Sequence, residues 1–159
     1  MSKITVRDAR PGDHADIVES NLRLAEETEQ KRLDPEVLGR GVSEALADPD
    51  RLKYWVAELS EPGGSRFVGQ AAITREWSDW RGGWIWWFQS VYVVDEYRGQ
   101  GVFRLLYATI RDTARESPDV IGLRLYVEGH NDRARRVYQS LGLGPSGYEV
   151  FEDIWPTGA

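Results

Sequence analysis

Apolar positions in this chain follow two different spacings, which together predict a mixed fold of strands and helices. Period-two alternation and short apolar runs are typical of strands, whereas apolar residues three and four positions apart are typical of one helix face. Strand patterns cover residues 4–6, 54–59, 67–74, 84–94, 120–127 and 148–155. Helix patterns cover residues 13–29, 35–47, 101–117 and 131–141. The resulting order, β-αα-β-β-β-α-β-α-β, is neither a doubly wound nor a barrel pattern.

Several of these boundaries carry capping and turn residues. Asp13 and Asp34 are good N-caps for the first two helices, and Pro35 suits the first helical position of the second. We expect these two helices to form a helical hairpin. The segment from Glu61 to Ser65 contains Pro-Gly-Gly and predicts the turn between two antiparallel strands.

The run at residues 84–94 is almost continuously apolar, which suits a central strand covered on both faces. Because side chains alternate along a strand, Trp84 and Trp86 should face opposite to Ile85 and Trp87. We expect one pair to pack under helices and the other to line a cleft or a dimer surface.

Chain length and composition favour one globular domain spanning residues 1–159. The 159 residues are 41% hydrophobic and contain no repeat or linker-like tract. The 20 Lys and Arg against 26 Asp and Glu give a net charge of −6, which argues against nucleic acid as a partner. The longest charge-free run, residues 82–94, is too short to span a bilayer. We therefore expect a cytoplasmic protein that binds neither nucleic acid nor membrane.

Cysteine and histidine content narrows the chemistry further. The chain has no cysteine, which excludes disulfides, a thiolate nucleophile and thiolate metal sites. The two histidines, His14 and His130, are too few for an imidazole-rich metal site. A carboxylate-rich magnesium site stays open, but we expect no metal.

A glycine-bearing turn, Arg98-Gly99-Gln100-Gly101, follows the central strand and leads directly into a helix. Glycines let the backbone approach a ligand closely, and the first N–H groups and the dipole of a helix favour an anion. Arg98 and Arg104 add charged donors. A plain strand-to-helix turn would have the same pattern. A dinucleotide motif would need glycine in place of Arg104, and a P-loop would need a lysine that is absent, which counts against a phosphotransferase.

A second pattern follows the next strand. Asn131, Ala134, Tyr138 and Gly142 are spaced so that Ala134 and Tyr138 share one helix face. Each residue taken alone has a structural explanation: an N-cap, a small packing residue, a core aromatic and a helix-ending glycine.

Together these two patterns and the element order resemble the GNAT superfamily of acyl-CoA N-acyltransferases. The resemblance covers essentially the whole chain, and its specific part runs from about Val91 to Leu143. It implies an α+β (mixed α/β) fold with a mostly antiparallel, twisted central sheet of six to seven strands and about four helices. The strands would splay at the cofactor site. The implied co-substrate is acetyl-CoA, and the implied assembly is a homodimer.

The resemblance also implies which residues hold the cofactor. Backbone amides of Val91 and Val93 would bind the pantetheine arm, and amides from Arg98 to Arg104 would bind the pyrophosphate. The full implied set is Val91, Tyr92, Val93, Arg98, Gly99, Gln100, Gly101, Val102, Phe103, Arg104, Asn131 and Tyr138. Phe103 departs from the family pattern, which usually has Gly or Ala there, and this puts the fine shape of the pyrophosphate site in doubt.

The mechanism expected for such an enzyme is direct transfer to an amine in a ternary complex, which needs no protein nucleophile. The Val93 amide could stabilise the oxyanion, and Tyr138, which the resemblance puts beside the thioester sulfur, could protonate the departing thiolate. The central strand has no carboxylate at residues 86–90, where some family members carry a glutamate. The candidate bases are Glu27, Glu76, Asp79 and Glu128, each of which could instead be a solvated surface carboxylate.

Charge is unevenly distributed, which bears on the acceptor. Residues 8–50 carry twelve acids and five bases, whereas residues 98–136 carry eight arginines and five acids. In this architecture the first two helices would wall the acceptor site, which suggests a small cationic amine. Trp77 and Trp80 could contact such an amine by cation–π interaction. Two alternatives stay open: a protein N-terminus or lysine as acceptor, and a non-catalytic acyl-CoA-binding or regulatory module.

Overall fold

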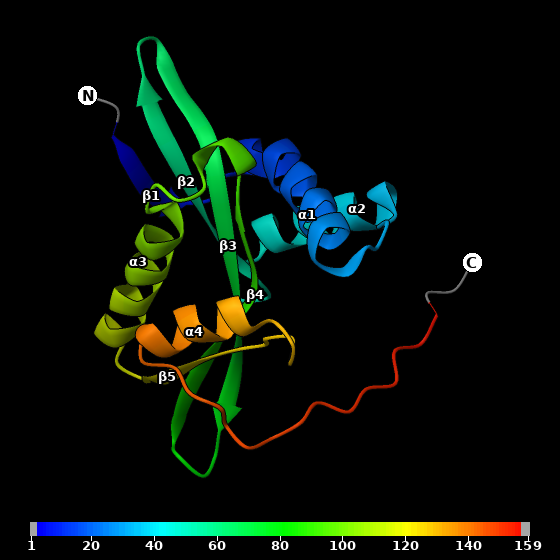
Figure 1. The fold of residues 1–159 in the computed structure, drawn as a ribbon, viewed down its shortest axis with the longest axis vertical. Helices are drawn as coiled ribbons and strands as arrows, with labels where there is room; N and C mark the ends of the chain where they lie inside the picture. The colour runs from blue at the N-terminus through cyan, green and yellow to red at the C-terminus, as the bar shows by residue number, and fades with distance from the viewer. Residues whose placement is uncertain (1–2, 157–159) are drawn as a thin grey trace. The chain divides into compact units, whose positions relative to one another are not determined.

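The computed structural model describes residues 3–156 and divides the chain into two compact units, residues 1–126 and residues 127–159. The first unit holds the five strands of a single sheet and three of the four described α-helices (Figure 1). The strands are β1 Ile4–Asp8, β2 Lys53–Glu61, β3 Gly64–Ser78, β4 Gly83–Val93 and β5 Val120–Leu125. Their spatial order is β1-β2-β3-β4-β5, antiparallel except for the parallel pair β4 and β5.

The first two helices cover one face of this sheet. α1 (His14–Glu29) and α2 (Pro35–Ala47) follow β1, and α2 is capped as the sequence predicts. The Asp34 carboxylate accepts hydrogen bonds from the amides of Glu36 (2.9 Å) and Val37 (3.4 Å). The core on this face is a cluster of buried residues from both helices and from the sheet: Ile17, Val42, Ala45, Tyr54, Val56 and Ala72.

The third helix, α3 (Val102–Glu116), covers the opposite face (Figure 1). Phe88 of β4 stacks on Tyr107 of α3 with ring centroids 5.6 Å apart. Gly69 of β3 lets the start of α3 lie close to the sheet, because a Cβ at this position would lie 2.7 Å from the Tyr92 carbonyl oxygen and 3.3 Å from Val102 Cγ1. The sheet is therefore a middle layer with helices on both sides.

Strand β4 contains a β-bulge that reverses the alternation of its side chains. Phe88 pairs with Ile73 and Ser90 pairs with Ala72, so Gln89 is an extra residue on β4. Bulges of this kind are enriched beside active sites. Here Phe88 faces α3, whereas Ser90, two positions later, shares the α1 face with its partner Ala72.

Before the bulge, the tryptophans of β4 lie as the alternation predicts. Trp86 is buried on the α3 side against Trp55, with ring centroids 6.0 Å apart. Trp87 lies on the opposite face, beside Thr74 of β3.

Asp13 differs from its predicted role as a side-chain cap. It occupies the N-cap position of α1, but its carboxylate makes no capping hydrogen bond to that helix. It instead accepts two hydrogen bonds from the Arg7 guanidinium (2.8 and 2.9 Å) and one from the Arg10 amide (2.6 Å). The hydrogen bonds from Arg7 hold the pKa of Asp13 below its ordinary value. The nearby, partly buried Arg7 outcompetes the helix N-terminus for this carboxylate.

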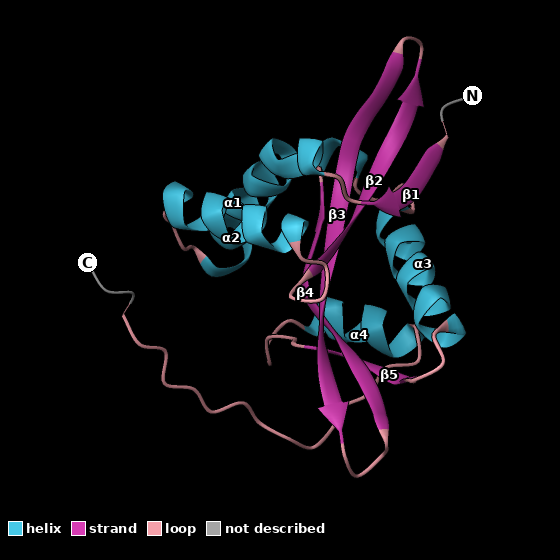
Figure 2. Ribbon diagram, turned by 180° about the vertical axis from the view of Figure 1, so that it is seen from behind, coloured by secondary structure: helices cyan, strands magenta, loops and turns pink. Residues whose placement is uncertain are grey.

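The predicted last strand is wrong, and this is why the sheet has five strands rather than six to seven. The second unit holds α4 (Asp132–Ser140), and residues 143–156 form no strand (Figure 2). The apolar side chains of Phe151, Ile154 and Trp155 are 91%, 78% and 80% exposed. Alternation gives a strand only where a neighbouring strand completes the hydrogen-bond ladder, and no described strand pairs with this segment. Across residues 3–156, no helix is both long and apolar enough to cross a membrane.

Candidate functional site

The edge of β4 that faces β5 is only partly paired. Parallel pairing runs from Trp84 to Phe88, and the last pair is Phe88 with Leu125. Beyond it β4 continues to Val93, paired with β3 on its other edge. Among the described strands, none lies against the remaining edge of residues 89–93, which include Val91, Tyr92 and Val93. Backbone groups on that edge are available to a ligand that runs alongside the strand.

This edge leads into the glycine turn. After the short 3₁₀ turn η2 (Asp95–Tyr97), Gly99 and Gly101 adopt φ angles of +76° and +84°, where glycine is strongly preferred. A Cβ built on either glycine meets nothing within 4 Å, so the outer surface of the turn is open. The Leu105 amide donates to the Gly101 carbonyl at 3.0 Å, which makes the amides of residues 102–104 the first-turn donors of α3.

The first turn of α3 holds three more of the predicted positions, Val102, Phe103 and Arg104. Val102 is buried and faces the sheet, and Arg104 is exposed. Phe103 stacks on Tyr107, with ring centroids 6.3 Å apart, and so extends the stack of Tyr107 on Phe88. Gln100 lies in the turn, where its side-chain amide donates to the Glu96 carbonyl at 3.1 Å.

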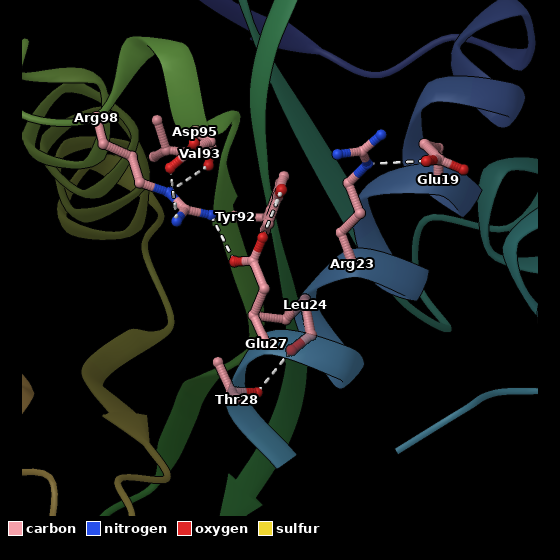
Figure 3. Close-up of polar contacts among 9 residues, drawn as sticks. All are labelled: Glu19, Arg23, Leu24, Glu27, Thr28, Tyr92, Val93, Asp95 and Arg98. Atoms are coloured by element: carbon pink, nitrogen blue, oxygen red, sulfur yellow. Dashed lines mark hydrogen bonds and ion pairs between the residues drawn. The ribbon is translucent and has the colours of Figure 1, made fainter. Parts of the chain in front are cut away.

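The Arg98 side chain turns toward α1 and β4. Its Nε donates to the Val93 carbonyl at 3.0 Å, its Nη1 lies 3.3 Å from Asp95 Oδ1, and its Nη2 lies 2.6 Å from Glu27 Oε2 (Figure 3). The guanidinium is thus held at three points within the protein. We expected this side chain to be a donor to a bound anion, but in this structure its donors serve the contact between the turn and α1.

Glu27 lies near the C-terminal end of α1 and also meets Tyr92. The Tyr92 hydroxyl donates to Glu27 Oε1 at 3.4 Å, and Arg98 lies over the Tyr92 ring at 5.3 Å (Figure 3). Burial, together with the Glu27 charge, raises the pKa of the Tyr92 hydroxyl above its ordinary value. Glu27, Tyr92 and Arg98 therefore form one cluster at the end of β4, and sequence spacing gave no sign of the Tyr92 to Glu27 contact.

Glu76 belongs to a separate group, which we call the Trp87 cluster: Glu76, Trp87, Arg124 and Tyr126. Glu76 Oε2 accepts from Trp87 Nε1 at 2.9 Å, and its Oε1 accepts from Arg124 Nη1 at 2.8 Å. Arg124 lies 5.8 Å from the centroid of the Trp87 ring, and Tyr126 lies 4.7 Å from it, centroid to centroid. Sequence reasoning missed Arg124 and Tyr126, although alternation along the predicted strand at residues 120–127 places both on one face.

Polar side chains lie on β3 and β4 at the bulge. Gln89 Nε2 donates to Thr74 Oγ1 at 2.7 Å, and Ser90 Oγ donates to Gln70 Oε1 at 3.2 Å. Gln70 is fully buried, and its Nε2 has no hydrogen-bond partner among residues 3–156. The bulge therefore carries polar groups where the sheet is otherwise apolar.

The other predicted residues lie elsewhere. Asp79 is exposed and accepts from the Trp80 amide at 2.8 Å. In the second unit, Glu128 accepts from the His130 amide at 2.8 Å. Asn131 caps α4 as predicted, accepting from the Ala134 amide at 3.1 Å. No group of three or more His, Asp or Glu side chains among the described residues is arranged to hold a metal ion.

Tyr138 lies on α4 and is half-buried. Burial raises the pKa of its hydroxyl above the ordinary value. The hydroxyl therefore stays protonated at neutral pH, which is the state a proton donor needs.

Comparison with known proteins identifies the family. The model of the acetyltransferase (GNAT) family matches residues 15–143. The chain belongs to the GNAT family. Thialysine N-epsilon-acetyltransferase of Bos taurus is 29% identical over 149 residues, covering 89% of this chain and 85% of the bovine protein. The Sus scrofa protein of the same name is 28% identical over the same shares of both chains. This GNAT protein is therefore an acyl-CoA-dependent acetyltransferase.

Solved GNAT-like structures confirm the fold predicted from the sequence. A possible acetyltransferase from Clostridium difficile 630 superposes with a TM-score of 0.88 and 39% identity, covering 97% of this chain and 99% of the other. A ribosomal-protein-alanine N-acetyltransferase from Brucella melitensis biovar Abortus 2308 superposes with a TM-score of 0.73 at 14% identity, over 97% of this chain and 100% of the other. At that identity the second likeness concerns the fold alone.

Proposed function

We propose that this GNAT protein moves an acetyl group from acetyl-CoA to the primary amine of a small cationic molecule, by direct transfer in a ternary complex. The observation that carries the proposal is the free edge of β4, which leads through the short turn η2 into an open glycine turn at the start of α3. An extended arm ending in a pyrophosphate matches such an edge followed by such a turn.

The donor half of the proposed site uses mainly backbone groups. The amides of Val91 and Val93 would bind the amide-bearing pantetheine arm, much as a strand binds an added strand. The amides from Arg98 to Arg104 would bind the pyrophosphate, because positive-φ glycines and the first turn of a helix direct N–H groups toward an anion. In line with the family resemblance, we also propose cofactor-binding roles for Asn131 and Tyr138, which belong to the second unit.

The proposed reaction needs an unprotonated amine and a leaving thiol. The amine nitrogen attacks the thioester carbonyl carbon, the C–S bond breaks, and a backbone amide on the free edge of β4 would stabilise the oxyanion that forms. Tyr138 would give its proton to the departing thiolate. Glu27 would take the proton that the amine loses, directly or through water. Its carboxylate lies near the end of β4, where it accepts a hydrogen bond from the Tyr92 hydroxyl. Glu76 accepts hydrogen bonds from Trp87 and Arg124, and we propose that it binds the acceptor instead.

The acceptor proposal rests on charge and on the relatives. The acidic first two helices favour a cationic amine, and the Trp87 cluster adds aromatic surface. Two relatives are thialysine N-epsilon-acetyltransferases, which supports an acceptor whose reacting amine lies at the end of a lysine-like chain. A net charge of −6 disfavours a polyanionic partner such as nucleic acid. We further propose that the protein is cytoplasmic and forms a homodimer, in which the exposed apolar side chains of residues 148–155 could be covered.

The first experiment compares thermal midpoints of the protein with acetyl-CoA, desulfo-CoA, ATP and NAD at equal concentrations. A ligand at about 100 times Kd adds about 2.7 kcal/mol, which should raise the midpoint by about 5–10 °C. We expect only the CoA compounds to do so, and thiol release to follow when amines are added. Stabilisation by ATP with magnesium alone would overturn the proposal. Stabilisation by acetyl-CoA without thiol release from any amine, peptide or protein would instead favour a non-catalytic acyl-CoA-binding module.

A further inference from the structure

We propose that the Trp87 cluster is the subsite for the α-amino-acid head of the acceptor, so that the enzyme acetylates the distal amine of a lysine-type amino acid. Arg124 would bind the α-carboxylate, Glu76 the α-ammonium, and the rings of Trp87 and Tyr126 the chain between them and the reacting amine. This inference rests on the proposed function and adds the substrate class to it.

The cluster lies on the acceptor face of the sheet. Trp87 pairs with Thr74 of β3. Thr74 shares its face of the sheet with Ala72, two positions earlier, and Ala72 packs in the core beneath α1 and α2. Ala72 in turn pairs with Ser90, two positions before Tyr92. Strand alternation therefore puts the Trp87 ring on the face where Tyr92 meets Glu27.

The cluster also lies beside the point where β4 and β5 part. The last parallel pair is Phe88 with Leu125, and Tyr126 is the first residue beyond it. The free edge that we assign to acetyl-CoA begins at Gln89. An acceptor held at the cluster would therefore lie beside the start of that edge.

The side chains of the cluster are accessible to a ligand. Tyr126 is 56% exposed, and the Glu76 side chain is 43% exposed. The Trp87 and Tyr126 rings, tilted by 37° to each other, give an apolar surface beside two opposite charges.

The charges of the cluster select among cationic acceptors. A guanidinium has five N–H donors, and the hydrogen bond from Arg124 to Glu76 uses one of them. The planar fork of Arg124 suits a carboxylate, whereas a second cation placed there would be repelled. Arg124 beside Glu76 therefore matches a zwitterion better than a polyamine, which has positive charge at both ends.

The test compares two acceptors that differ only by the carboxylate: L-thialysine and bis(2-aminoethyl) sulfide. Thiol release from acetyl-CoA gives kcat and KM for each, and mass spectrometry identifies the acetylated nitrogen. We expect the wild type to prefer thialysine at least tenfold in kcat/KM, with acetylation at the distal amine. Arg124→Gln should lower that preference at least tenfold, mainly through KM for thialysine.

Arg111→Gln is the matched control. Arg111 also pairs with a carboxylate, that of Asp112, and lies 5.9 Å from the centroid of the Tyr107 ring, but it belongs to α3 on the opposite face. It should leave the preference within about twofold. Should Arg124→Gln fold poorly, Arg124→Lys keeps the charge without the planar fork and should still lower the preference severalfold.

The outcomes separate the two proposals. A wild type that acetylates L-thialysine and bis(2-aminoethyl) sulfide equally well would overturn the subsite and leave the proposed function standing. An Arg124→Gln variant that keeps the preference for thialysine would do the same. A wild type that binds acetyl-CoA but releases no thiol with these or any other amines would overturn the proposed function, and the subsite with it.

Discussion

Arg98 Nη2 lies 2.6 Å from Glu27 Oε2, and this ion pair joins the turn before α3 to the end of α1 across 71 positions of sequence. The same guanidinium holds the Val93 carbonyl, the last residue of β4. The proposed pyrophosphate turn and the proposed acceptor wall are therefore linked through one side chain. Binding at the turn and chemistry at Glu27 should respond together to changes in Arg98.

Because of this link, we expect substitutions of Arg98 and Glu27 to change the free energy of unfolding little, and substitution of Glu27 to lower turnover strongly. The two side chains are 42% and 40% exposed, so a double-mutant cycle of Arg98→Gln and Glu27→Gln should give a coupling free energy of only about 0.5–1 kcal/mol. Glu27→Gln should lower kcat at least tenfold, because the amide cannot accept the amine proton. Denaturant unfolding and thiol-release kinetics measure the two quantities.

Glu19→Gln is the control for Glu27. Glu19 forms a comparable exposed ion pair with Arg23 on the same helix, at 2.8 Å (Figure 3). Its substitution should leave kcat within about twofold. Equal losses for the Glu19 and Glu27 variants would show that Glu27 acts through the helix surface charge and not as a base.

Tyr138→Phe should separate chemistry from binding. Removing the hydroxyl should lower turnover at least tenfold while the Kd for acetyl-CoA stays within a few-fold, because the ring and its packing are kept. Burial raises the pKa of this hydroxyl, so the wild type should stay active until the hydroxyl loses its proton in the alkaline range. Tyr138→Phe should lack that alkaline fall. An unchanged kcat would remove Tyr138 from the mechanism.

Gly101→Ala tests the open turn. A Cβ at this position meets nothing within 4 Å, so the penalty should come from the φ of +84° rather than from a clash, and should be about 1–2 kcal/mol. The reoriented amides should weaken acetyl-CoA binding at least tenfold. Gly41→Ala in α2, also open, should stabilise the protein by about 0.5–1 kcal/mol and leave binding unchanged. Equal binding by both variants would argue against the turn as the pyrophosphate site.

Asp13→Asn should destabilise the protein in a pH-dependent way. The Asp13 side chain is 12% exposed and bonded to Arg7, so its loss should lower the unfolding free energy by about 2–4 kcal/mol at pH 7. Because the folded pKa lies below the ordinary 3.8, the stabilisation is present above about pH 4. It is lost as the pH falls through the lowered value. The difference between wild type and variant should therefore shrink in acid, as urea unfolding across pH can measure, and a constant difference would contradict this.

Local rules predicted the helices and most of the strands well. Asp34, Pro35 and Asn131 were identified from short-range chemistry, because a cap depends on residues two or three positions away. The glycine turn was also predicted from the sequence, since a positive φ favours glycine wherever the turn is placed.

The predictions that went wrong depended on contacts that the folded sheet and helices make, beyond the two or three neighbouring positions that set a cap. Asp13 was expected to cap α1 with its side chain, but Arg7 takes its carboxylate. Residues 148–155 alternate like a strand, but among the described residues no strand completes their ladder. The bulge at Gln89 has no local signature either, because it exists only as a mismatch in the pairing of β4 with β3.

By itself the sequence determined the family, the order of elements as far as α4, and the position of the glycine turn, because these follow from spacing along the chain. Only the tertiary structure decided which side chains face one another. It turned Arg98 toward Glu27 and brought Arg124 to Glu76 across 48 positions. The physical reason is that charges pair with whichever opposite charge the packed sheet and helices bring within about 4 Å, and a one-dimensional pattern does not specify that distance.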